Sequence, residues 1–394
     1  MKPHTSSENT PPKEPWWGSV AVRSIAYQVI ALLVIVGGAA WLVSVTMSNL
    51  ATRNISTGFS FLHQEAGFLI GESLLPTHAG DTYGRLILAG FVNTLRVAAI
   101  GIVLSTVLGL VVGLLRLSSV RLVQKIVSGY IELIRNIPLL LQLFFWYALI
   151  TENAPGPRQA YQPLPGVFLS NRGLQLPSLE GAAVPWAIGG LAAGFIALVV
   201  ILHRLRRSNR PPLTSGKLAW FALATLLGGA VLGYVMGGAS LSLEVPQLSG
   251  FNFQGGLNLS PEFTALMLGL VAYNAAFIGE IVRSGVQSIP KGQWEAAESI
   301  GLSKSMTLRR VIIPQALRVM IPPMTNQYLS LIKNSSLAVA IGYPDIVAVM
   351  NTTITQTGQA IEGVVILMSS YLIFSLLVSI FMNWYNRRVA LVGR

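Results

Sequence analysis

Residues 86–115 of this chain read LILAGFVNTLRVAAIGIVLSTVLGLVVGLL, and this stretch decides the fold. It carries a single charged residue, Arg96, and is longer than the roughly 20 residues that a helix needs to cross a hydrocarbon core about 30 Å thick. Backbone groups in lipid must bond within their own segment, so such a stretch forms a helix. The chain is therefore expected to be built from membrane-spanning helices.

The rest of the sequence agrees with a lipid-embedded protein. Hydrophobic residues make up 52% of the 394 residues, charged residues 11%, and the mean hydropathy is +0.60. The sequence predicts an all-α polytopic membrane protein with about eight spans. They are placed near 25–47, 86–115, 129–150, 183–202, 218–237, 261–283, 315–343 and 363–384.

The distribution of basic residues predicts the orientation. With the N-terminus inside, the five cytoplasmic segments hold 20 of the 27 Lys and Arg residues and the outer loops hold four. Cytoplasmic loops carry such an excess, so both termini are expected in the cytoplasm. The apolar stretch that follows the polar tail is too long for a signal-peptide core, which predicts a retained first helix.

Signals for enzyme chemistry are absent from the sequence. The dipeptide Gly216-Lys217 precedes Leu218, so no phosphate-binding loop is formed there. The four histidines are scattered without metal-ligand spacing, and zero cysteines exclude disulfides and thiolate ligands. No nucleophile and base stand together. We expect no metal site and no enzyme.

The cytoplasmic segment 285–313 is predicted to fold rather than to be disordered. Residues 295–300 favour a helix on which Trp294, Ala297 and Ile300 share one face, and Gly301 can end it in the left-handed conformation. Ser303 is a candidate N-cap for a second short helix. Pro314 either ends this helix or begins the next span. This helix-turn-helix is either an amphipathic interfacial linker or a docking element.

The run EAAESIGLSKSMTLRRVIIPQA (295–316) closely resembles the EAA loop of ABC-importer permeases. The resemblance implies that this loop couples the chain to a separate ATPase subunit. The residues carried over are Glu295, Ala296, Ala297, Gly301 and Pro314. The chain departs from the usual pattern only in having Ile313 where Leu commonly precedes the proline.

Three further blocks resemble the branch that imports polar amino acids such as histidine, glutamine and arginine: YIELIRNIPLLLQLFF (130–145), LSPEFTALMLGLVAYNAAFIGEIVRSG (259–285) and LIKNSSLAVAIGYPDI (331–346). The enlarged layout is most like the long subunit of general L-amino acid permeases. The resemblance implies a type I ABC importer permease fold with extra helices. The expected parts are a tail (1–22), an extra span (23–50), a first core part (86–150), an inserted outer loop with two spans (151–258), a second core part (259–385) and a tail (386–394).

The resemblance implies a permease subunit of a bacterial inner-membrane amino acid importer that works by alternating access. Implied partners are ATP-binding cassette ATPase subunits, which would bind ATP and Mg, a second permease chain and a periplasmic binding protein; no cofactor is expected in this chain. Which amino acids are carried, whether the permeases pair as homodimer or heterodimer, and what the insert does stay open. An ion- or proton-coupled secondary transporter is the alternative, but the acids in the spans are few and peripheral.

Polar residues within the spans are candidates for the substrate path because their insertion is costly. Arg135, with Asn136 beside Pro138, either meets a substrate carboxylate or pairs with Glu132 three residues earlier. Lys333 caps a broken helix or binds substrate. Asn274 forms a hydrogen bond with either a helix or a substrate, and Arg96 either snorkels outward or lines the entrance. Glu280 and Arg283 are expected to pair near the cytoplasmic end. The remaining candidates are Asn334 and Ser335.

Small residues recur every fourth position at Gly101, Ser105, Gly109 and Gly113. Such a ridge lets another helix approach closely. It joins two permease chains or packs inside one chain.

Overall fold

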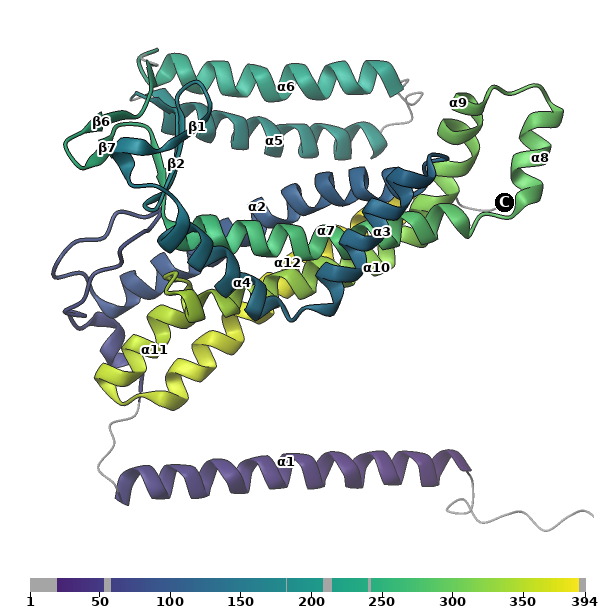
Figure 1. Ribbon diagram of the computed structural model, residues 1–394. Coiled ribbons are helices and arrows are strands. Elements are labelled where there is room, and N and C mark those ends of the chain that lie inside the picture. Colours follow the sequence, from purple (N-terminus) through teal and green to yellow (C-terminus); the bar gives the residue numbers. More distant parts are fainter. Residues whose placement is uncertain (1–19, 53–57, 182, 208–214, 240–241, 390–394) are drawn as a thin grey trace, which may run out of the picture.

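The computed structural model describes residues 20–52, 58–181, 183–207, 215–239 and 242–389, and most of these are helical (Figure 1). Two of the expected parts, most of the N-terminal tail and the last residues of the C-terminal tail, lie outside the described residues. The long helices are α1 (Val20–Thr52), α2 (Tyr83–Arg116), α3 (Arg121–Asn136), α4 (Leu139–Ala148), α5 (Ala183–Arg207), α6 (Ser215–Met236), α7 (Pro261–Gln287), α10 (Ile313–Asn334), α11 (Ile346–Thr357) and α12 (Ala360–Val389).

Within this part of the chain, four helices are long and apolar enough to cross a membrane, and up to six spans result if each bent helix pair counts as one. The four are α1, α2, α7 and α12, and the two bent pairs contain α3 with α4 and α10 with α11. The apolar stretches of α5 and α6, Ala183–Leu198 and Trp220–Met236, are shorter. The predicted multi-pass helical fold is confirmed, whereas the count of eight stays a prediction.

The span expected at 129–150 is not one helix. It is divided into α3 and α4, which meet at an angle of 103°. Pro138 has no N–H to continue α3 and holds Ile137 in an extended conformation (φ −93°, ψ 127°). The carbonyls freed at the break are bonded again by the Gln142 amide, which donates to Ile134 O at 2.8 Å and to Ile137 O at 2.9 Å. The break thus keeps two of its carbonyls bonded, at Ile134 and Ile137.

The span expected at 315–343 also changes character along its length. The α-helix α10 ends at Asn334 and continues as the 3₁₀-helix η6 (Ser335–Ile341), which Gly342 stops with a positive φ of 82°. The helical segment is thus continuous past Lys333, and both alternatives for this residue, a cap of a broken helix and a substrate contact, stay predictions. The hydroxyls of Ser335 and Ser336 donate to backbone carbonyls at the transition.

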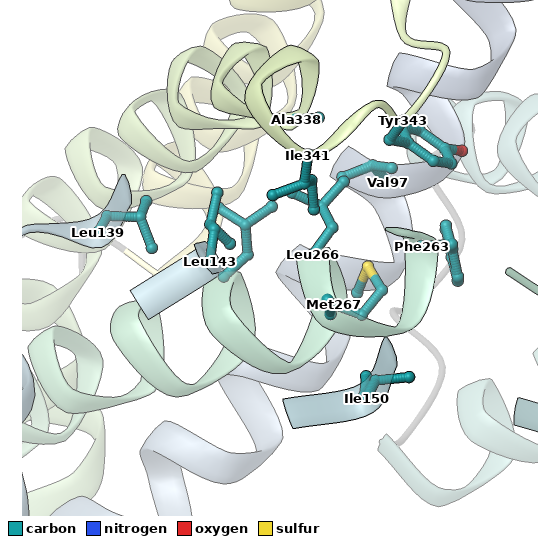
Figure 2. Packing of buried hydrophobic residues seen from close by; sticks show 12 residues of the cluster. Val97, Leu139, Leu143, Ile150, Phe263, Leu266, Met267, Ala338, Ile341 and Tyr343 are labelled. Carbon is teal, nitrogen blue, oxygen red and sulfur yellow. The ribbon is translucent and has the colours of Figure 1, made fainter. Parts of the chain in front are cut away.

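The core of the bundle lies where α2, α4, α7 and η6 meet (Figure 2). Leu143 of α4 and Leu266 of α7 are fully buried there, and Ile341 of η6 lies against them. Val97 of α2 joins the same cluster, so four segments that are far apart in the sequence share one core. This packing places the break between α3 and α4 against the centre of the molecule.

The ridge of small residues on α2 packs inside the chain, against α7. A Cβ at Gly109 would lie 2.6 Å from Ile278 Cβ, and one at Gly113 would lie 2.6 Å from Val282 Cβ. Gly101 lies against Leu331 of α10, and Ser105 is fully buried. Of the two alternatives for the ridge, packing within one chain is the one that the structure shows.

The segments that flank α5 and α6 contain short β-strands, so the expectation of an all-α chain is wrong there. Strands β1 (Tyr161–Leu164), β2 (Val167–Ser170), β3 (Gly173–Leu176) and β8 (Leu257–Leu259) form an antiparallel sheet in that order. Backbone outside the hydrocarbon region need not be helical because water and neighbouring strands can bond it. Two further pairs are β4 (Ser178–Glu180) with β5 (Ser242–Glu244), and β6 (Gln247–Ser249) with β7 (Asn252–Gln254).

Helices α5 and α6 form a hairpin whose backbones touch. A Cβ at Gly190 would lie 2.1 Å from Gly229 O, and one at Gly233 would lie 2.0 Å from Trp186 O, so only glycine fits at these crossings. The pairing of β4 with β5 extends the hairpin beyond the helix ends. In Figure 1 the pair is drawn at the top of the view and α1 at the bottom, with the bundle between them.

Candidate functional site

The predicted helix-turn-helix is present between α7 and α10. Its first helix, α8 (Lys291–Ser299), ends at Gly301, which has a positive φ of 77°. The N–H of Gly301 donates to Glu298 O at 2.9 Å and the N–H of Leu302 donates to Ala297 O at 3.1 Å, which is the Schellman pattern of a glycine-terminated helix. The glycine stop inferred from the sequence is confirmed.

The second helix of the loop starts where the sequence predicted. Ser303 caps α9 (Lys304–Thr307), and its hydroxyl accepts from Met306 N at 3.4 Å. The π-helical turn η5 (Leu308–Ile312) continues α9 into α10 without a gap, and Pro314 lies in the first turn of α10. Pro314 has no N–H to continue the hydrogen-bond ladder, and it comes just after the π-helical turn, where the α-helical bonding pattern is already interrupted.

One face of α8 is packed onto the bundle and the opposite face is open. Ala297 is buried (3% exposed), and Trp294 packs against a cluster that includes Ile312. The third residue of the predicted face, Ile300, is 75% exposed because it is the C-cap, where the chain already leaves the helix. Glu295 and Ala296 lie on the exposed surface.

The loop is held by α7 and α10 together. Gln315 Nε2 donates to Gln293 Oε1 at 3.0 Å and so ties α10 to α8. Above this bond, a Cβ at Gly285 would lie 2.4 Å from Met320 Cγ, so α7 and α10 are in close contact. Figure 1 shows α8 and α9 projecting from one end of the bundle, opposite the strands. A force applied to α8 would be passed to both helices.

A charged cavity of about 440 Å³ lies between α2, α3 and α7. On one wall, Arg116 Nη1 is 3.0 Å from Glu280 Oε2, and Arg283 Nε donates to Glu280 Oε1 at 3.1 Å. The predicted pair of Glu280 with Arg283 is confirmed. The lining residues are Arg116, Ile131, Glu132, Arg135, Asn136, Phe277 and Glu280.

The opposite wall of this cavity carries the charged residues of α3. The pair of Glu132 with Arg135 that their spacing suggested is not among the ion pairs of the described chain. Arg135 instead lies over the ring of Phe277, with its Cζ 4.9 Å from the ring centroid. The contact with α7 competes with the local pairing, so both charged ends stay exposed to the cavity.

Glu280 lines this cavity with Arg135 and Asn136, and the other path candidates lie outside its lining. Asn274 is fully buried and serves helix packing: its Oδ1 accepts from Gln327 Nε2 at 2.6 Å and its Nδ2 donates to Leu270 O at 2.7 Å. Ser335 is buried and donates to Ile332 O at 2.7 Å. Lys333 is exposed and Asn334 half-buried at the end of α10. The cavity therefore brings Arg135 and Asn136 of α3 together with Glu280 of α7.

The ion-pair partner of Arg96 was not predicted from the sequence. Arg96 borders a cavity between α2, α7 and the strands β3 and β8, where its Nη1 is 2.6 Å from Glu72 Oε1 and its Cζ lies 4.2 Å from the centroid of Phe263. Both charged side chains are largely buried, at 11% and 15% exposed. Glu72 also accepts from Ser260 N at 3.2 Å, and so joins α2 to the start of α7. An acidic residue 24 positions away in a loop gives no periodic signal.

Metal chemistry finds no support in the described part of the chain, where no group of three or more His, Asp or Glu side chains is placed to hold an ion.

The features above define a polytopic, mostly helical membrane protein with a folded loop at one end. Residues 105–391 match the family described as binding-protein-dependent transport system inner membrane component, and the chain belongs to this family.

Individual relatives agree with the family. The chain is 48% identical to the putative amino-acid ABC transporter permease protein YhdX of Escherichia coli (strain K12), over 95% of each chain. It is 43% identical to the general L-amino acid transport system permease protein AapQ of Rhizobium johnstonii, over 94% of this chain and 93% of that one. The crystal structure of an amino acid ABC transporter with histidines aligns with 78% of this chain and 95% of that chain, at 22% identity and a TM-score of 0.46.

Family membership confirms the resemblance on which the sequence analysis relied. The chain is a membrane component of an ABC importer, with the permease fold of that class, and is not itself an enzyme, since separate subunits hydrolyse ATP in such systems. The alternative of a secondary transporter gains no support from the family match or from these two relatives.

Proposed function

We propose that this chain is the permease subunit of an ATP-driven importer of amino acids in a bacterial inner membrane. The relatives that it matches along nearly its whole length are described as amino-acid permeases. The observation that carries the coupling role is the folded loop: α8 is buried on the bundle side through Ala297, tied to α10 and open on its other face.

The open face of α8 is the proposed docking surface for the ATPase. Glu295 offers a carboxylate, the small side chain of Ala296 admits a close approach, and the buried Ala297 fixes the helix to the bundle. Gly301 gives the loop its turn, and Pro314 starts the helix that receives the motion. Movement of α8 with α7 and α10 as one body would alternate the access of a central path.

The docking surface can be tested by purifying the complex from its native membrane. The variant Ala296→Trp places a bulky side chain on the open face and is expected to lose the co-purifying ATPase. Gly129→Trp is the matched control, because Gly129 lies on an exposed part of α3 with no atom within 4 Å of its Cβ position. Equal ATPase recovery with both variants would contradict docking at α8.

Energy coupling is tested by uptake in cells. ATP-driven import is expected to stop when ATP is depleted and to persist when an uncoupler removes the proton gradient. The opposite pattern would contradict the proposal and restore the secondary transporter.

The proposed assembly contains two permease chains, two ATPase subunits and a periplasmic binding protein. ATP and Mg would be bound by the ATPase, and no cofactor by this chain. Native mass measurement of the purified complex checks the stoichiometry. A complex with one permease chain would contradict it.

We propose eight spans with both termini in the cytoplasm, including α5 and α6 within the insert 151–258. The absence of cysteine allows single-cysteine labelling. Ser6→Cys, Ser208→Cys and Ser305→Cys are expected to react only after the membrane is permeabilised, and Ser249→Cys in intact spheroplasts. Equal reaction at positions 208 and 249 would show that α6 does not cross.

The insert is proposed to contact lipid or the binding protein through α5, α6 and the outer strands. Its ends are joined by the pairing of β3 with β8, where Leu174 lies opposite Leu259. Removal of 152–258 takes away α5, α6 and these strands except Leu259, and so tests the role of the whole insert. Unchanged uptake and unchanged binding-protein association after that deletion would defeat the proposed role.

A further inference from the structure

The charged cavity between α2, α3 and α7 has equal numbers of positive and negative groups. Its lining contains two guanidinium groups, of Arg116 and Arg135, and two carboxylates, of Glu132 and Glu280. Ionisable groups in the spans of a membrane protein are costly and are placed for function. A balanced set of charges suits a ligand that also carries both signs and no net charge.

The four charges divide into a paired set and an open set. Arg116 and Glu280 are bound to each other at 3.0 Å, with only 17% and 24% of their side chains exposed. Glu132 and Arg135, by contrast, lie on the exposed face of α3, and no hydrogen bond or ion pair of the described chain joins them to another residue. The cavity thus presents one open cation and one open anion from a single helix.

This pair of groups matches the two charged groups that all α-amino acids share. A guanidinium presents N–H donors in a planar fork that fits both oxygens of a carboxylate. A carboxylate accepts from an ammonium group, which has three donors and no acceptor. Arg135 and Glu132 are one helical turn apart, on one face of α3. The cavity of about 440 Å³ falls within the usual range for small-ligand sites, roughly 300–1,000 Å³.

The position of Arg135 is biased towards the cavity before any ligand arrives. Its guanidinium lies 4.9 Å from the centroid of Phe277, which holds the group by a cation–π contact while leaving its edge free. Asn136 follows at the end of α3, where the helix breaks and Gln142 bonds the freed carbonyls. A preorganised group loses less freedom on binding.

We propose that this cavity binds a free amino acid by its charged ends, with Arg135 on the α-carboxylate and Glu132 on the α-ammonium group. The inference rests on the proposed function and deepens it. A site that reads the groups common to all amino acids leaves the side chain free to vary. A phosphate group is the competing ligand, but it would bring two negative charges to a lining that already holds two carboxylates.

The test uses the intact transporter complex in lipid nanodiscs without the binding protein. Binding of radiolabelled L-glutamine is measured, with three unlabelled competitors: the α-amide of glutamine, which lacks the α-carboxylate, glutaramic acid, which lacks the α-ammonium group, and inorganic phosphate. The wild type is expected to bind glutamine and to discriminate at least tenfold against each competitor.

The variants separate the two contacts. Arg135→Gln should weaken glutamine binding at least tenfold and abolish discrimination against the α-amide, while discrimination against glutaramic acid remains. Glu132→Gln should do the reverse. Arg121→Gln, at the exposed start of α3 and outside the cavity lining, is the control and should bind as the wild type does.

Three results would overturn the proposal. If Arg135→Gln weakens the binding of all ligands equally, the residue has a structural role. If phosphate competes as well as unlabelled glutamine does, the cavity is an anion site. If both variants bind glutamine as the wild type does, the substrate binds elsewhere. ATP-dependent uptake by the same wild-type complex, reconstituted with its binding protein, is measured in parallel. Uptake without glutamine binding at the cavity overturns only this inference, and absence of both overturns the proposed function as well.

Discussion

Replacing Gly109 by alanine tests the contact between α2 and α7. The new Cβ would lie 2.6 Å from both Cβ and Cγ2 of Ile278 and 3.2 Å from Ala275 O. Carbon atoms pack best at about 3.5–4.0 Å, so the helices must separate locally by about 1 Å. Overpacking of this kind costs roughly 1–3 kcal/mol.

The helix propensity of alanine would offset part of that loss, by about 1 kcal/mol. Gly129→Ala on α3 has the same propensity gain, and its Cβ would meet no atom within 4 Å. The difference between the two variants therefore isolates the packing term. We expect Gly109→Ala to be less stable than Gly129→Ala by about 1–3 kcal/mol.

The measurement is equilibrium unfolding of the purified chain in mixed micelles, titrated with a denaturing detergent and followed by tryptophan fluorescence. A difference between the variants of less than a few tenths of a kcal/mol would refute the packing of α2 on α7. If Gly109→Ala instead lowered the fraction of paired permease chains without changing the stability of one chain, the ridge would lie between chains.

Three other changes have definite expected outcomes. Gln142→Leu leaves two carbonyls of the α3–α4 break without their donor and should lower the unfolding free energy by about 1–3 kcal/mol in the same titration. The control Gln124→Leu changes an exposed residue of α3 and should lower it by less than about 0.5 kcal/mol, as is usual for surface substitutions. Glu72→Gln leaves the Arg96 guanidinium without its carboxylate and should lower the unfolding free energy by about 3 kcal/mol. Adding Arg96→Met should restore part of this loss of stability. If the double variant is no more stable than Glu72→Gln, the pairing is contradicted. A hydrogen bond with Glu244 raises the pKa of the Glu180 carboxyl. The contribution of Glu180 to the pairing of β4 with β5 is therefore fully present below the ordinary pKa of a glutamate, and it is lost as the pH rises through the raised pKa. Hydrogen exchange of 178–180 and 242–244, corrected for the intrinsic rate, should show protection falling with pH, and Glu180→Gln should remove that trend.

Local signals explain why the loop between α7 and α10 could be predicted. Gly301, Ser303 and Pro314 each act on the backbone within a few residues, so the glycine stop, the serine cap and the first-turn proline are visible in the sequence. Pro138 likewise acts locally, because it cannot continue α3, but a proline does not by itself set the angle of the break, which is 103° here.

Residues that act over long sequence distances were missed or misjudged. The three-residue spacing of Glu132 and Arg135 favours a pair, yet Phe277, which follows more than 140 positions later, draws the guanidinium across to α7. The strands escaped prediction because each has only three or four residues and several pair with partners more than 60 positions away. Glu72 lies in a loop without any repeating pattern.

The contacts of the cavity walls connect the proposed substrate site to the proposed coupling loop. Helices α2 and α7 are in close contact at Gly113 and Val282, and α7 touches α10 at Gly285 and Met320, so the wall that holds Arg116 and Glu280 belongs to one tightly packed body. The same body carries α8 through Gln315 and Gln293.

The opposite wall of the cavity belongs to α3, which is packed on both α2 and α7. Val127 and Ile131 are buried between these helices, and Tyr130 Oη donates to Ala272 O at 2.8 Å. The charged face of α3 meets α7 through the cation–π contact of Arg135 with Phe277, which is worth about 0.5–2 kcal/mol. In the proposed mechanism, a push on α8 therefore reaches the wall that holds Arg116 and Glu280 through α10 and α7, and it changes the cavity first at this weak contact.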